Sequence, residues 1–127
     1  MNKDMLMIDG LQYVNWNRGL FEQAQRSGLH AIHVTIAYWE NSRETLENIG
    51  HWNRHFLDHG DLIMPVHQAA DILEAKRLGK VGIIFGFQNC SPMEDDVKMV
   101  QILQQLGVRI MQLSYNNQSL LATGCYE

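Results

Sequence analysis

Short apolar segments alternate along the chain with longer amphipathic segments, and several of the amphipathic segments end at a glycine. The clearest apolar segment is Val81 to Phe87, which contains no polar side chain. Such a segment is typical of a strand that is buried on both faces of a parallel sheet. The alternation therefore predicts an α/β fold in which helices join parallel strands through right-handed crossovers.

The expected strands are short and rich in aliphatic residues. They comprise Leu6–Ile8, Ala31–Ala37, Leu62–Val66, Val81–Phe87 and Val108–Leu113, and a polar tail of residues 114–127 follows the last of them. The first is expected to be buried. Pro65 cannot donate a hydrogen bond to a neighbouring strand, so the strand that contains it is expected at a sheet edge or in a linker.

The expected helices begin at capping residues and end at glycines. They run from Arg18 to Ser27, from a capping box at Asn41 and Glu44 to Gly60, from Ala69 to Leu78, and from Ser91-Pro92 to Gly107. In the second helix the apolar stripe consists of Leu46, Ile49, Trp52 and Phe56. In the fourth, Glu94, Asp95 and Asp96 are expected in the first turn, where the helix dipole favours negative charge.

The 127 residues correspond to about one domain, and no linker divides them. Ten Lys and Arg against fourteen Asp and Glu give a net charge of −4, which argues against a nucleic-acid partner. No apolar run approaches the roughly 18 residues that a membrane span needs. Cys90 and Cys125 do not form a disulfide framework, and neither lies in a redox motif, so we expect a cytoplasmic protein.

Two architectures satisfy this pattern of strands and helices. One is a small doubly wound sheet, and the other is the first half of an eight-stranded barrel, since about 250 residues are typical of the complete fold. Hydrophobic periodicity does not choose between them. In both, functional side chains lie at the carboxyl ends of the strands.

Amide and phenol side chains dominate the positions that follow the predicted strands. They include Tyr13, Tyr38, Gln88, Asn89, Tyr115 and Asn116, together with Leu11, Trp39, Glu40 and Cys90. These amides and phenols could bind a polar ligand through hydrogen bonds, and the amides could equally hold loop backbone in place. They offer little to zinc, which requires clustered His, Cys or carboxylate ligands.

The histidines and Cys90 give weaker signals. His51, His55 and His59 recur every four residues, a spacing that can place two zinc ligands on one helix face. Their helical phase lies away from the apolar stripe, so we expect them to face solvent. His33 and His67 are expected to be structural, and Cys90 is expected to be a small buried thiol.

Two segments carry a family resemblance: Gly79 to Asn89 (GKVGIIFGFQN) and Leu106 to Asn116 (LGVRIMQLSYN). Together with Ile8-Asp9-Gly10 near the start and Gly124-Cys125-Tyr126-Glu127 at the end, they resemble the membrane (renal) dipeptidase family. Within it, the chain is most similar to a bacterial subgroup with altered metal-ligand positions. The resemblance implies a metal-dependent hydrolase (β/α)8 barrel, so residues 1–127 are expected to form a single partial barrel domain that lacks the C-terminal half.

The resemblance also implies a catalytic centre, which this sequence alters. Members of the family use two zinc ions to activate a water that attacks the peptide bond of a dipeptide. The two metal ligands of the first strand correspond to Leu11 and Tyr13, the bridging glutamate to Gln88, and a substrate-binding histidine to Tyr115. We therefore expect no metal to be bound by this chain, and we expect its pocket to be lined by Leu11, Tyr13, Gln88, Asn89, Tyr115 and Asn116.

Two functional hypotheses follow. The first is the N-terminal half of a hydrolase that cleaves peptide or amide bonds in a small dipeptide-like substrate, with this chain alone inactive. The second is a noncatalytic pseudoenzyme that serves as a ligand-binding or interaction module. In both cases the open edges of a half-barrel predict a homo-oligomer or completion by a second half-barrel chain.

Overall fold

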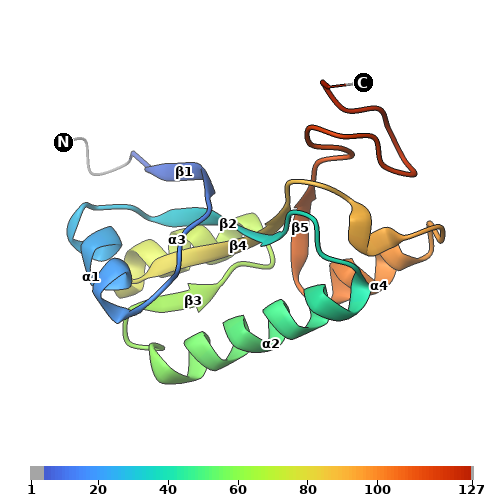
Figure 1. Cartoon of the computed structure of the whole chain (residues 1–127). Coiled ribbons are helices and arrows are strands. Elements are labelled where there is room, and N and C mark those ends of the chain that lie inside the picture. Colours follow the sequence, from blue (N-terminus) through green and yellow to red (C-terminus); the bar gives the residue numbers. More distant parts are fainter. Residues whose placement is uncertain (1–4, 127) are drawn as a thin grey trace.

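The computed structural model describes residues 5–126, and strands and helices alternate throughout (Figure 1). The strands are β1 (Ile8–Gln12), β2 (Ala31–Ala37), β3 (Ile63–Pro65), β4 (Val81–Phe87) and β5 (Val108–Met111). The helices are α1 (Arg18–Arg26), α2 (Ser42–Asp58), α3 (Ala69–Leu78) and α4 (Met99–Gln105), with a 3-10 turn, η1, at Ser91–Met93. This arrangement confirms the predicted parallel α/β fold.

β4 lies at the centre of the five-stranded sheet, and every pairing in it is parallel. β2 pairs with β4 along its length and with β1 on its other side. The remaining edge of β4 is shared, because β3 pairs with Val81–Ile83 and β5 with Phe85–Phe87. β3 ends at Pro65, which has no N–H to donate, and this agrees with the edge position predicted for it.

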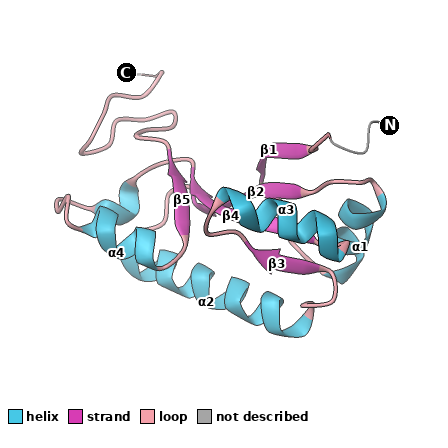
Figure 2. Cartoon of the chain, turned by 180° about the vertical axis from the view of Figure 1, so that it is seen from behind, coloured by secondary structure: helices cyan, strands magenta, loops and turns pink. Residues whose placement is uncertain are grey.

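The hydrophobic core lies between the sheet and its helices. Alternate residues of β4 enter it, namely Val81, Ile83, Phe85 and Phe87. Phe21 of α1 and Trp52 of α2 pack there with ring centroids 6.1 Å apart. α2 runs along the lower side of the sheet in Figure 1. In the opposite view of Figure 2, α3 lies in front of the sheet. No helix within residues 5–126 is long and apolar enough to cross a membrane.

The first strand differs from the prediction. β1 begins at Ile8 and continues through Gln12, so Leu11 lies within the strand and does not follow it. It is not a buried strand either, since the Ile8 side chain is 47% exposed. The reason is its edge position: β1 pairs only with β2 in the described sheet, and neighbouring structure covers little of it.

The predicted fourth helix is wrong in its first turns. Ser91–Met93 form η1, the backbone of Glu94 adopts a φ of 50°, and α4 begins only at Met99. Such a φ is incompatible with a continuing right-handed helix. The acidic run at 94–96 therefore lies in a connecting turn and not at a helix N-terminus.

The predicted orientation of α2 is also wrong in part. Leu46 is half exposed, and the buried position one residue earlier is taken by Thr45. His51 is exposed as predicted, whereas His55 and His59 are only partly exposed, because their rings pack against Phe21 with centroids 5.5 and 5.4 Å away. The aromatic surface that α1 contributes accounts for this packing.

Candidate active site

The carboxyl ends of β1, β2 and β5 bring four aromatic side chains together, which we call the aromatic cluster: Tyr13, Tyr38, Trp39 and Tyr115. Tyr38 is at its centre, with ring centroids 4.6 Å from Tyr115, 4.8 Å from Trp39 and 5.7 Å from Tyr13. The sequence placed all four at strand ends, and the parallel sheet makes them neighbours.

Tyr115 is the neighbour that most affects the ionisation of Tyr38. A side-chain hydrogen bond with Tyr115, followed by partial desolvation, raises the pKa of Tyr38 to about 12. The Tyr38 phenol therefore stays neutral and able to donate a hydrogen bond at any physiological pH.

Gln88 is buried at the end of β4 and serves to join two strands. Its Nε2 donates to Thr35 Oγ1 at 2.9 Å, and its backbone N donates to Ala37 O at 2.9 Å. An amide that donates to a hydroxyl is fixed in orientation, so Gln88 holds the carboxyl end of β4 against β2.

A cavity of about 750 Å³ opens beside the aromatic cluster, between the ends of β2 and β4 and the segment that follows β5. We call it the Trp39 cavity. Its lining residues are Trp39, Asn89, Cys90, Ser91, Glu94, Asn117, Gln118, Ser119, Leu120 and Leu121. Asn89 is buried, and its Oδ1 has no hydrogen-bond partner. Burial raises the pKa of the Cys90 thiol, so this group is neutral and a poor nucleophile.

The other predicted pocket residues lie nearby in different surroundings. Tyr13 is 67% exposed and lines a second cavity, of about 330 Å³, that His51 and His55 also border. Leu11 is partly exposed on the edge strand β1. Asn116 holds the C-terminal segment, because its Oδ1 accepts from Cys125 Sγ at 3.4 Å and its carbonyl accepts from Tyr126 N at 3.0 Å.

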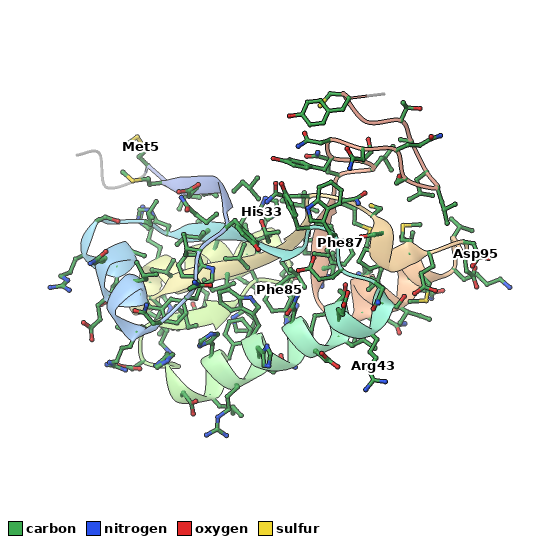
Figure 3. The ribbon with its side chains drawn as sticks, viewed as in Figure 1. Met5, His33, Arg43, Phe85, Phe87 and Asp95 are labelled. Carbon is green, nitrogen blue, oxygen red and sulfur yellow. The ribbon has the colours of Figure 1, made fainter. Side chains whose placement is uncertain are left out.

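The sequence analysis predicted a structural role for His33 and did not identify its contacts. His33 lies on the sheet face opposite Phe85 (Figure 3), with its Nδ1 2.6 Å from Gly10 O and its buried Nε2 without a partner. A donated Nδ1–H fixes the ring tautomer and leaves Nε2 as an acceptor. The sequence signal for this arrangement is Gly86, a glycine on β4 that leaves room for the ring of His33 on the neighbouring strand β2.

The residues present do not fit a two-zinc centre. Within residues 5–126 no three His, Cys, Asp or Glu side chains are grouped so as to hold a metal ion. Leu11 has no ligand atom, and the Gln88 amide is neutral and already bonded to Thr35. A binuclear zinc site needs an anionic bridging ligand, which neither residue provides.

The parallel sheet, with the aromatic cluster at its carboxyl ends, is consistent with the first half of a (β/α)8 barrel. The family model described as membrane dipeptidase (peptidase family M19) matches residues 12–127, and the chain belongs to this family. No curated protein sequence matches the chain.

Solved structures share the fold. The chain is 46% identical to an amidohydrolase from Pseudomonas aeruginosa, with a TM-score of 0.96, covering 98% of this chain and 38% of that one. The probable dipeptidase PvdM from P. aeruginosa is 16% identical with a TM-score of 0.83, and the match covers 95% of this chain and 37% of that one. Dipeptidase AC, a metallopeptidase, is 14% identical with a TM-score of 0.74, and the match covers 88% of this chain and 43% of that one. The chain thus spans about two fifths of the length of these structures.

Proposed function

We propose that the chain supplies the N-terminal half of the substrate-binding barrel of a hydrolase that cleaves peptide or amide bonds. Membership of the membrane dipeptidase family over residues 12–127 is the observation that carries the proposal. The aromatic cluster and the Trp39 cavity support it, because they provide phenol, amide and carboxylate groups at the strand ends where barrel enzymes bind substrate.

In this proposal the chain binds and orients a small dipeptide-like substrate, and groups outside residues 5–126 activate the attacking water. Gln88 has a positioning role, since it fixes the end of β4 through Thr35. Leu11, Tyr13, Asn89, Tyr115 and Asn116 border or support the binding region. Any catalytic metal is held by ligands outside the described residues.

We further propose that the chain works in association with another chain, either a second copy or a second half-barrel. β1 and β5 are paired on one side only in the described sheet, and Leu11 and Ile110 on these strands are each more than 40% exposed. Unpaired strand edges with apolar side chains favour association. A light-scattering mass equal to one chain, with a cooperative thermal transition, would contradict this proposal.

A chimera tests directly whether this chain can serve as the N-terminal half of an active hydrolase. The matching 38% of the P. aeruginosa amidohydrolase is replaced by this chain, and release of amino acids from a panel of dipeptides is measured with and without a chelator. Chelator-sensitive hydrolysis is expected, with the parent protein as the control. A folded chimera that binds dipeptides and cleaves none, beside an active parent, would instead support the noncatalytic binding module.

A further inference from the structure

The residues that line the Trp39 cavity carry a single negative charge. Glu94 is the one charged side chain among the residues that line it, and the others are amides, hydroxyls, a neutral thiol and apolar groups. Its Oε1 accepts from the backbone N of Ser42 at 3.4 Å, which places the carboxylate beside the start of α2. A cavity with one carboxylate and no cationic side chain attracts a cation and repels an anion.

The wall of the cavity also contains an unused hydrogen-bond acceptor. Asn89 is 5% exposed, and its Oδ1 accepts no hydrogen bond. A buried carbonyl oxygen without a partner is costly, and a ligand N–H is the group that would remove this cost. The ligand should therefore carry hydrogen-bond donors as well as positive charge.

Trp39 supplies an aromatic surface to the same cavity. Its side chain is 48% exposed, and its ring makes T-shaped contacts with Tyr38 and Tyr115, with centroids 4.8 and 5.8 Å away. An indole face that is fixed in place attracts a cation, and its attraction is the strongest among the aromatic side chains.

We propose that the Trp39 cavity binds the primary ammonium group of a small molecule, with Glu94 and Asn89 accepting its N–H groups and Trp39 facing its charge. This binding site extends the proposed function and does not depend on it, because ammonium binding requires no hydrolysis.

The test measures binding of three probes to the full chain by NMR, followed through the Trp39 indole N–H and the Asn89 side-chain amide. Propylammonium has charge and donors, tetramethylammonium has charge alone, and propionate has the opposite charge. We expect propylammonium to bind about tenfold more tightly than tetramethylammonium, as expected for charge-assisted hydrogen bonds, and propionate to cause no shift. Equal binding of the two cations, binding of propionate, or no response to propylammonium would overturn the proposal.

Two matched variants separate the site from general charge effects. Glu94→Gln removes the carboxylate in the cavity, and Asp95→Asn removes the neighbouring charge, which does not line the cavity. Both side chains are exposed, so both variants are expected to fold. Propylammonium binding should weaken about tenfold in Glu94→Gln and stay unchanged in Asp95→Asn. Equal weakening in both would show long-range attraction only and would overturn the site.

Discussion

The His33 imidazole occupies the space that a side chain at position 86 would need, since a Cβ built on Gly86 overlaps His33 Nε2. The two residues lie on adjacent strands, where β2 pairs with β4. The ring is held in this place by the contact of its Nδ1 with Gly10 O on β1. Gly86 therefore lets one histidine link three neighbouring strands beneath the candidate site.

Substitution of Gly86 by alanine should destabilise the fold strongly. The new methyl group must displace the His33 ring, which breaks the contact with Gly10, and overpacking of this kind costs about 2–3 kcal/mol. Chemical denaturation measures the loss in free energy of unfolding. The double variant Gly86→Ala, His33→Ala should recover part of it, because the clash is then absent.

Gly50 provides the matched control for this substitution. It lies in α2, and a Cβ added there meets nothing within 4 Å. Gly50→Ala should raise the free energy of unfolding by about 0.5–1 kcal/mol, as expected for glycine in a helix interior. Equal effects of the two alanines would contradict the role assigned to His33.

Introducing a carboxylate at position 88 should destabilise this chain. In Gln88→Glu the donated hydrogen bond to Thr35 is lost, and a charge is placed at a buried position, for a cost of about 1–3 kcal/mol. Burial disfavours the ionised form, so the loss should grow as pH rises through the carboxyl pKa. Thermal unfolding at several pH values measures it, and the exposed Gln101→Glu should shift stability by less than about 0.5 kcal/mol.

Local patterns predicted much of the fold. The strands Ala31–Ala37 and Val81–Phe87 and the helix Ala69–Leu78 have the predicted bounds, because aliphatic runs and a terminal glycine specify them locally. Gly79 adopts a φ of 66°, as expected of a glycine that ends a helix. The strand ends then follow, which is why Tyr115 and Asn89 could be expected near the carboxyl ends of strands from the sequence.

The features that the sequence could not predict depend on tertiary contacts between segments distant in the chain. Ser91-Pro92-Met93-Glu94 satisfies the local rules for a helix start, yet Ser91 Oγ donates to Glu40 O and Ser42 Oγ to Pro92 O, and both contacts tie η1 to the start of α2. The Trp39 cavity was missed for the same reason, because its lining residues, such as Glu94 and Asn117, are far apart in sequence and are brought to one cavity only by the fold.

The hydrogen bond between Tyr38 and Tyr115 should be visible in titration. The pKa of Tyr38 is raised from 10.0 to about 12, so its contribution to stability is complete below pH 10.0 and is lost as pH rises toward about 12. In Tyr115→Phe we expect the pKa of Tyr38 to fall toward 10.0, measured by the ultraviolet absorbance of tyrosinate. An unchanged pKa would show that the hydroxyl of Tyr115 is not the cause.

Acid should destabilise the contact between α1 and α2 through His55. Burial, followed by the charge of His59, lowers the pKa of His55 below its ordinary 6.5, so the folded state prefers the neutral ring that packs against Phe21. The unfolded chain takes up a proton first, and this part of the stability is present above pH 6.5 and decreases as pH falls through that value. His55→Phe keeps a ring against Phe21 and removes the titration, so the free energy of unfolding should depend less on pH between about 5 and 7. The control His51→Gln, at an exposed position, should retain most of the pH dependence of the free energy of unfolding. If His55→Phe instead kept the full pH dependence of the parent, that dependence would belong to another histidine.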